Sequence, residues 1–99
     1  MTDTEAIRFI TSHLIDINTA KPSTAMVYYI FSDELNGKVS LKLGGLINMD
    51  AFDSEEAAKE WLKIAKTTYG EALNAFGSLR VKAMTQRKFI SEYREKEGR

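Results

Sequence analysis

The amino-acid sequence predicts a small α+β protein, in which an antiparallel sheet of three to four strands carries helices on one face. Two segments, one near the N-terminus and one after residue 53, repeat apolar residues with helical spacing. Between and after them lie short runs of aromatic, β-branched or alternating residues, which favour strands. Because short glycine-containing links join these runs, antiparallel pairing is expected. The predicted order is α-β-β-β-α-β, with or without a short final helix.

The first predicted element is a helix at the N-terminus. Thr2 and Glu5 have the spacing of a capping box, in which a hydroxyl and a carboxylate satisfy the free amide groups of the first turn. Pro22 is expected to end the helix, because the residue before a proline is disfavoured in helical geometry. Apolar residues at helical spacing form one stripe between these signals: Ile7, Ile10, Leu14 and Ile17.

Three strands are predicted next, over residues 24–32, 38–43 and 46–51. The first contains consecutive aromatic and β-branched residues, and the second alternates apolar and polar ones. Asn36-Gly37 and Gly44-Gly45 are turn signals, and they separate the three strands. The sequence therefore predicts a meander of neighbouring antiparallel strands.

A second helix is predicted to begin after Asp53 or Ser54, both of which can cap it. Its apolar stripe continues to Phe76, with a break or kink expected at Gly70 because glycine weakens a helix. Gly77 is expected to end this segment. An alternating strand over residues 78–84 and a short helix from residue 86 complete the prediction.

A single domain is expected over residues 1–99, because this length suits one hydrophobic core. The chain is 43% hydrophobic and 28% charged, which is ordinary for a globular protein. The predicted core residues share the apolar faces of the predicted elements: Ile7, Ile10, Leu14, Val27, Tyr29, Phe31, Val39, Leu41, Leu43, Trp61, Leu62, Leu73 and Val81.

The composition also restricts the function. Without cysteine there is neither a disulfide framework, nor a thiolate zinc site, nor a cysteine nucleophile. Fourteen basic and fourteen acidic residues cancel, so net charge predicts neither a nucleic-acid binder nor a nucleic-acid mimic. The acidic N-terminus is unlike a secretory signal, and no apolar run is long enough to span a membrane. We expect a cytoplasmic protein without membrane contact.

No residue pattern indicates catalysis, a metal or a cofactor. His13 is the single histidine, and the sequence suggests no partner for it. The acidic residues Asp50, Asp53, Glu55 and Glu56 lack the regular spacing of a calcium loop, and helix capping accounts for most of them. Gly44-Gly45 is not followed by the residues of a phosphate-binding loop. We therefore expect a protein that is not an enzyme and takes no cofactor.

One candidate interface comes from the first strand, which is apolar on both faces. If Val27, Tyr29 and Phe31 face the helices, then Met26, Tyr28 and Ile30 face the other way. An exposed apolar face of this kind marks a binding surface for a partner protein or a second copy. The alternative is that the C-terminal segment folds over this face through three apolar or aromatic residues: Phe89, Ile90 and Tyr93.

A second candidate surface is basic. No acidic residue occurs from residue 72 to 91, whereas four basic ones do. Lys38 and Lys42 share the polar side of one predicted strand, and Arg80 and Lys82 share that of another. If both sides face away from the helices, with Tyr28 beside them, the sheet would offer cations and an aromatic ring to a single-stranded nucleic acid. The alternative is an ordinary solvated face carrying lysines.

The segment Phe52-Asp53-Ser54-Glu55-Glu56, followed by Trp61, resembles the strand-to-helix junction of a small phage-encoded anti-CRISPR protein. This resemblance covers about a tenth of the chain and implies a small cysteine-free inhibitor encoded by a phage or mobile element. No functional residue can be transferred from it. The leading hypothesis is a non-enzymatic protein that acts through a protein–protein interface, as an inhibitor, an immunity-type protein or an accessory subunit. The alternative hypothesis is a nucleic-acid-binding module.

Overall fold

The structure is a computed structural model that describes residues 2–45 and 47–97. Its helices and strands confirm the predicted α+β class, including the final helix. In chain order the elements are α1 (Asp3–Ser12), β1 (Met26–Ser32), β2 (Gly37–Lys38), β3 (Leu41–Leu43), β4 (Ile47–Met49), α2 (Glu55–Tyr69), the 3₁₀ helix η1 (Gly70–Phe76), β5 (Leu79–Thr85) and α3 (Gln86–Glu97).

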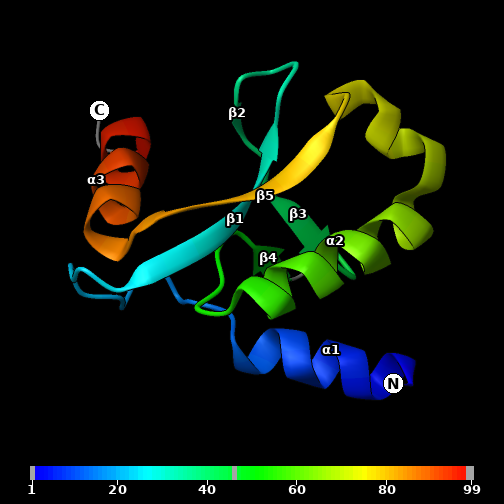
Figure 1. The fold of residues 1–99 in the computed structure, drawn as a ribbon, viewed down its shortest axis with the longest axis horizontal. Helices are drawn as coiled ribbons and strands as arrows, with labels where there is room; N and C mark the ends of the chain where they lie inside the picture. Colours follow the sequence, from blue (N-terminus) through cyan, green and yellow to red (C-terminus); the bar gives the residue numbers. More distant parts are fainter. Residues whose placement is uncertain (1, 46, 98–99) are drawn as a thin grey trace.

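The strands form two ladders rather than the single predicted meander. The larger sheet has the order β2-β1-β5, so that β1 is central and β5 lies at an edge (Figure 1). β1 and β5 are antiparallel partners along their whole length, from Met26 opposite Thr85 to Ser32 opposite Leu79. β3 and β4 pair only with each other among the described strands.

The predicted strand over residues 38–43 is divided between these two ladders. Val39 still donates its backbone N–H to the carbonyl of Ile30, at 2.9 Å, which ends the β2 side of the larger sheet. The chain then leaves that sheet, and Leu41 pairs with Met49 in the smaller one. Both Val39 and Leu41 are buried, so the apolar alternation is satisfied although the strand is interrupted.

The larger sheet is covered on both faces, which answers the question that the sequence left open. α1 and α2 lie on one side of β1, and α3 lies on the other (Figure 1). Ile30 packs in the same cluster as α2 residues, whereas Val27 and Tyr29 pack with Phe89 of α3. The C-terminal segment therefore folds over the face of β1 that carries Val27 and Tyr29.

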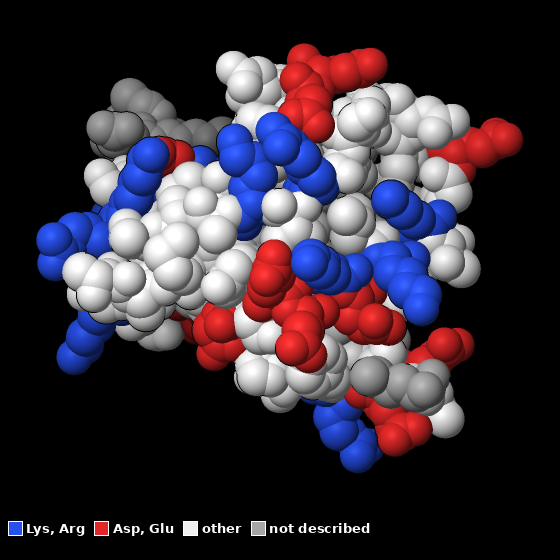
Figure 2. Space-filling view, viewed as in Figure 1, with Lys and Arg blue, Asp and Glu red and all other residues white. Residues whose placement is uncertain are grey.

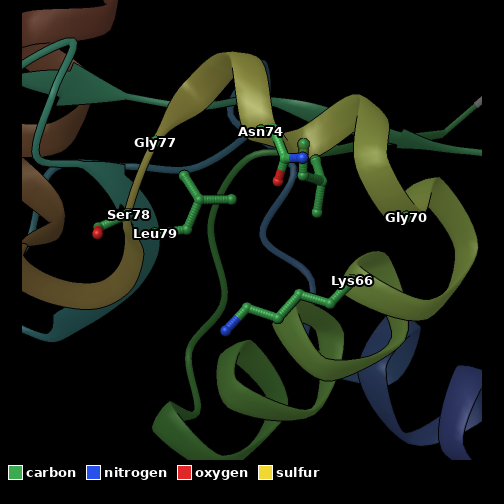
Figure 3. Close-up of a pocket in the computed structure, with 7 residues that line it drawn as sticks. Lys66, Gly70, Asn74, Gly77, Ser78 and Leu79 are labelled. Carbon is green, nitrogen blue, oxygen red and sulfur yellow. The ribbon is translucent and has the colours of Figure 1, made fainter.

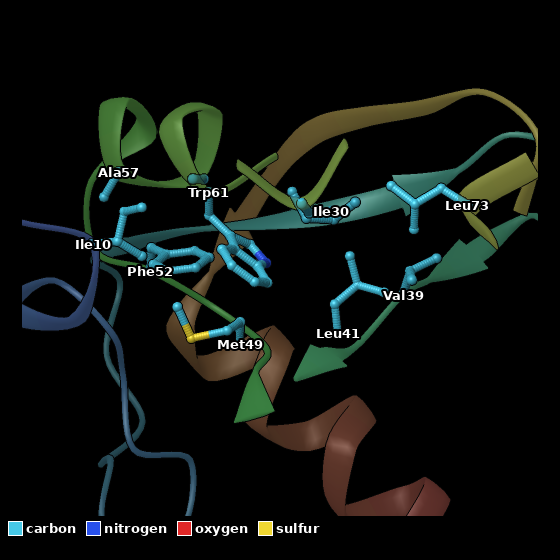
Figure 4. Close-up of a cluster of buried hydrophobic side chains, with 11 residues drawn as sticks. Ile10, Ile30, Val39, Leu41, Met49, Phe52, Ala57, Trp61 and Leu73 are labelled. Atoms are coloured by element: carbon cyan, nitrogen blue, oxygen red, sulfur yellow. The ribbon is translucent and has the colours of Figure 1, made fainter. Parts of the chain in front are cut away.

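The main hydrophobic cluster lies between β1, α2 and the β3–β4 ladder. Trp61, Phe52, Ile10 and Ile30 are its largest fully buried members (Figure 4). Phe52 is buried although the sequence placed it at the start of a helix; it forms an isolated bridge with Tyr28 instead. Among the predicted core residues, Ile10, Val27, Tyr29, Val39, Leu41, Trp61 and Leu73 are buried, and Ile7, Leu14, Phe31, Leu43, Leu62 and Val81 are half-buried.

The first helix is shorter than predicted. The capping box between Thr2 and Glu5 is confirmed, and these hydrogen bonds lower the pKa of the Glu5 carboxyl. The helix ends at Ser12 with His13 as its C-cap, so the expectation that it continues to Pro22 is wrong. The reason is tertiary, because the backbone beyond the cap bonds to a distant segment: Ile15 donates to the carbonyl of Ala51 at 2.9 Å.

The second helix begins and ends where the sequence predicts. The Ser54 hydroxyl accepts from the Ala57 amide as the N-cap, and Gly70 ends the helix with a φ of 54°. The chain then continues as the 3₁₀ helix η1, which ends with Gly77 as its C-cap; the φ of Gly77 is 67°. Both values lie in the left-handed region that glycine adopts without steric penalty. These two glycines turn the chain back toward the sheet, where β5 begins.

Candidate functional site

The apolar residues predicted to form an interface do not lie together on an open surface. Ile30 has no exposed area, so its assignment to an exposed face is wrong. Tyr28 is half-buried against the main cluster, and only Met26, at 44% exposed, is open to solvent. The physical reason is that β1 has a covering layer on each face. Its two sets of alternating residues are both apolar, and the sequence alone did not identify which set faces α2.

The predicted basic group is assembled in part. Opposed residues of neighbouring strands share a face, and the register opposes Lys38 and Arg80 to Phe31, and Lys82 to Tyr29. These three basic residues therefore occupy the α3 side of the sheet. Lys42 lies in the β3–β4 ladder, so its predicted membership of this group is wrong.

The aromatic residues beside the basic group are Phe31 and the buried Tyr29 rather than Tyr28. Tyr28 is opposite Ala83, on the other face of the sheet. The Lys82 ammonium lies 4.1 Å from the centroid of the Phe31 ring, and the Arg80 guanidinium lies 5.7 Å from it. Both are within the range of a cation–π attraction. Figure 2 shows basic side chains gathered over β5, beside the turn between β1 and β2.

Two of the three cations also have an acidic partner. The Arg80 guanidinium donates to the Asp33 carboxylate at 2.9 Å, and Lys38 donates to Glu92 of α3 at 2.5 Å. All four side chains are at least one-third exposed, so each pair contributes little stability. Lys82 has no carboxylate partner among the described residues. The group is therefore less positive than a count of its basic residues indicates.

The outer edge of β5 carries backbone groups that none of the other described strands uses. Tyr28 exchanges two hydrogen bonds with Phe52, at 2.8 and 2.9 Å, on the side of β1 away from β5. Since the bonding direction alternates along a strand, Val27, Tyr29 and Phe31 bond toward β5. Their partners are Met84, Lys82 and Arg80. Val81 and Ala83 must then direct their N–H and C=O groups away from the sheet, and neither has a backbone partner among the described residues.

A cavity of about 300 Å³ lies at the start of this edge. It is bounded by the end of α2, by η1 and by the first residue of β5, Leu79. Figure 3 shows the Lys66 side chain extending across it toward Ser78 and Leu79, with Asn74 on the opposite side. Leu73 and Leu79 supply an apolar lining, whereas Asn74 and Ser78 supply polar groups.

A second hollow of about 490 Å³ lies between α3 and the segment from β2 to β4. Its charged lining consists of the Lys38–Glu92 pair and Asp50. Burial raises the pKa of the nearby Tyr29 hydroxyl, and the negative charge of Glu92 raises it further. The residues of this hollow hold α3 against the sheet, so we interpret it as the seam between two packed elements.

One arrangement was missed by sequence reasoning, a histidine–aspartate pair. Nδ1 of His13 is 2.7 Å from the Asp53 carboxylate, although the residues are 40 positions apart. The Asp53 amide also donates to the carbonyl of His13, at 2.9 Å. The pair thus connects the end of α1 to the residue before the cap of α2. The cavities described above do not include either residue.

Two of the four acidic residues that the sequence offered as metal ligands have other partners. Asp53 pairs with His13, and Glu55 pairs with Lys59 one turn along α2, at 3.4 Å. Within residues 2–45 and 47–97, no group of three or more potential ligands is close enough to hold a metal ion. In the same part of the chain, every helix is too short or too polar to cross a membrane.

Comparison with known proteins gives no indication of function, so the function must be inferred from the geometry of the structure. No protein family, no curated protein and no solved structure matches this chain.

Proposed function

We propose that this chain is a non-enzymatic binding protein that acts through a protein–protein interface along β5. We call this interface the β5 surface, and define it as the outer edge of Leu79–Thr85 together with Met26, Phe31, Arg80 and Lys82. The observation that carries the proposal is the free edge of a seven-residue strand that is fully paired on its other side. Free strand edges form interfaces because their unpaired N–H and C=O groups can form hydrogen bonds with a strand of another chain.

The side chains around this edge fit a protein partner. Met26 is exposed beside Thr85, on the face of the sheet that carries Tyr28, and Phe31 is half-buried beneath two cations on the opposite face. Aromatic residues, methionine and arginine are the residues that protein interfaces favour. An unbranched methionine can adapt to an irregular partner surface.

A nucleic-acid partner is the second candidate, and it is favoured by the contact of Arg80 and Lys82 with Phe31. Four observations weigh against it. Lys42 lies elsewhere, Arg80 is paired with Asp33, and Lys82 covers the ring on which a base would stack. The net charge of the chain is zero, so no general attraction to phosphates assists it.

Within the class of binding proteins, we favour an inhibitor that blocks its partner sterically; an immunity-type protein or an accessory subunit would use the same surface. The resemblance to a phage-encoded anti-CRISPR protein supports the inhibitor form. Its residues have folding roles here, since Phe52 and Trp61 are core residues and Ser54 caps α2. The proposal therefore includes that a phage or mobile element encodes this protein, but it assigns no specific residue to the inhibitory function.

The test is capture of a partner by the immobilised protein from a lysate of its source, with and without nuclease. The double variant Arg80→Glu/Lys82→Glu reverses the charge of the β5 surface. The matched control is Arg8→Glu/Lys63→Glu, which changes one exposed arginine and one exposed lysine on α1 and α2. We expect a nuclease-resistant protein to be captured by the wild type and the control, and lost with the β5 variant.

Two results would contradict the proposal. Capture that disappears with nuclease, and weakens steeply with salt, would favour the nucleic-acid candidate because each phosphate contact releases a counterion. Equal capture by both double variants would place the interface elsewhere.

A further inference from the structure

We infer that the occupant of the β5 surface is an extended, acidic segment of a partner protein, which joins the larger sheet as a new strand beside β5. This inference rests on the proposed function and specifies the kind of partner. It combines three observations: the outward backbone groups of β5, the sign of the charges beside them, and the cavity where the strand begins.

The backbone geometry suits strand addition. Val81 and Ala83 each direct one N–H and one C=O away from β1 and have no backbone partner within the described residues. Ala83 is exposed and Val81 is half-buried, so an arriving chain can reach both. A segment paired at these two residues would make four main-chain hydrogen bonds, which is how extended peptides bind sheet edges.

The charges along β5 select an acidic strand. Arg80 and Lys82 lie on one face of the sheet, and the side chains of an added strand on that face would stand opposite them. Arg87 and Lys88 follow at the end of the strand, and the sequence has no carboxylate from residue 72 to 91. Since side chains alternate between faces, acidic residues at every second position of the partner would meet this basic row.

The same charges disfavour a second copy of this chain. Pairing Val81 with Val81 of another copy puts Arg80 opposite Lys82, and pairing Val81 with Ala83 puts Lys82 opposite Lys82. Like charges directly opposite each other destabilise a strand pair. A basic edge thus opposes self-association while it accepts an acidic segment.

The cavity beside Leu79 provides a site for one side chain of the added strand. Leu79 shares a face with Ile30 and Val81, on the α2 side, away from Arg80 and Lys82. The partner residues on this face alternate with the acidic ones. An apolar residue at the end of the segment would therefore reach the lining formed by Leu73 and Leu79.

The probe that follows from this geometry is a peptide of about eight residues with alternating glutamate and valine and capped ends, long enough to run beside β5. Its matched control replaces every glutamate with lysine. Binding is followed by the backbone amide resonances and hydrogen exchange of the isotope-labelled full chain. We expect the glutamate peptide to slow exchange at Val81 and Ala83, whereas Lys82, already bonded to Tyr29, changes little.

The decisive variant is Ala83→Pro. Proline removes the outward N–H, which bonds to nothing described in the folded chain, so the native ladder keeps all its bonds. We expect binding of the glutamate peptide to fall about tenfold or more, because one hydrogen bond is lost and the ring obstructs pairing. Ala83→Ser keeps the N–H and should bind like the wild type.

A second measurement covers the case in which Ala83→Pro unfolds. A glutamate–valine peptide that is N-methylated at alternate residues, so that it cannot donate to β5, is titrated against the wild-type chain. Loss of binding supports strand addition, and unchanged binding overturns it.

The failure of this inference can be separated from failure of the proposed function. If a nuclease-resistant partner is captured through the β5 surface but the peptide does not bind, strand addition by an acidic segment is wrong and the protein interface remains. Equal binding of the lysine peptide, or of Ala83→Pro, overturns the inference in the same way, as does formation of a β5-dependent dimer. If neither the peptide nor any protein binds, both proposals fail.

Discussion

β1 and β5 are partners of equal length, seven residues each, yet they differ in how far they are buried. Four residues of β1 are buried, whereas every residue of β5 is half-buried or exposed. The difference does not come from pairing, because the two strands are aligned along their whole length. It comes from position, since β1 is the central strand, with β2 and β5 on its two sides and a covering layer on each face, whereas β5 lies at an edge.

The two strands show how one sheet divides its roles. Apolar residues on both faces of β1 bind two layers together. The main cluster meets there with a second cluster, which contains Val27, Tyr29 and Phe89 of α3. β5 alternates apolar residues with Arg80 and Lys82, as a strand with one solvated face does. Changes in β1 and its cover are therefore expected to alter stability, and changes in β5 to alter binding.

The largest expected effect comes from removing the cover that α3 places over β1. Phe89 is 3% exposed, and its ring lies 5.8 Å from that of Tyr29. We expect Phe89→Ala to lower the free energy of unfolding by about 3–5 kcal/mol, through lost burial and a cavity. The control Arg87→Ala, exposed on the same helix, should change it by less than about 0.5 kcal/mol. Urea unfolding measures both, and equal small effects would show that α3 does not cover the sheet.

The next effect compares the two strands at one rung of their ladder, where Ile30 opposes Val81. Ile30→Ala should lower the free energy of unfolding by about 2–5 kcal/mol because Ile30 is completely buried. Val81→Ala removes a half-buried side chain and should cost about 1 kcal/mol. Thermal and urea unfolding of the two variants test this order; similar losses would mean that the edge strand is as buried as the central one.

A smaller effect concerns pH and the α3 side of β1. Burial, assisted by Glu92, raises the pKa of the Tyr29 hydroxyl above that of an unfolded tyrosine, which is about 10. The unfolded chain then releases this proton at lower pH than the folded chain does. Stability from Tyr29 is therefore complete below about pH 10 and declines as pH rises from there through the folded-state pKa. Tyr29→Phe should reduce the loss of melting temperature between about pH 9 and 11, whereas Tyr28→Phe serves as the neighbouring control. An unchanged loss in Tyr29→Phe would contradict the prediction.

The smallest effect on stability is expected at the exposed pair beside β5. Asp33→Asn removes the carboxylate that holds Arg80, and should lower the free energy of unfolding by less than about 1 kcal/mol because both side chains are exposed. The freed guanidinium should strengthen binding of the acidic peptide. Titration of wild type and variant tests this, and weaker binding by Asp33→Asn would show that Arg80 must be held by Asp33 to act.

Part of the candidate site was accessible from the sequence. Alternation alone placed Arg80 and Lys82 together, and the absence of acids around them was visible. The contact of Lys82 with Phe31, the cavity at Leu79 and the pairing of His13 with Asp53 were not predicted. Each of these contacts joins residues far apart in the chain, and a local sequence pattern does not show which distant residues will meet.

The sequence by itself determined the features whose causes lie within a few residues. The capping box of Thr2, the Ser54 cap, the turn at Gly44-Gly45 and the break at Gly70 are of this kind, and all four were confirmed. Such signals act through neighbouring backbone groups, so they can be read in order along the chain.

Only the tertiary structure decided where α1 ends, where the predicted strand over residues 38–43 divides, and which face of β1 meets α2. Leu14 continues the helical spacing, but its backbone is part of a bridge to Phe52. Val27 and Ile30 are equally apolar, and their separation into different clusters follows from which helix reaches each face. Periodicity indicates that a side chain will be buried. Which element packs against that side chain depends on long-range packing, because elements distant in sequence compete for the same apolar surface.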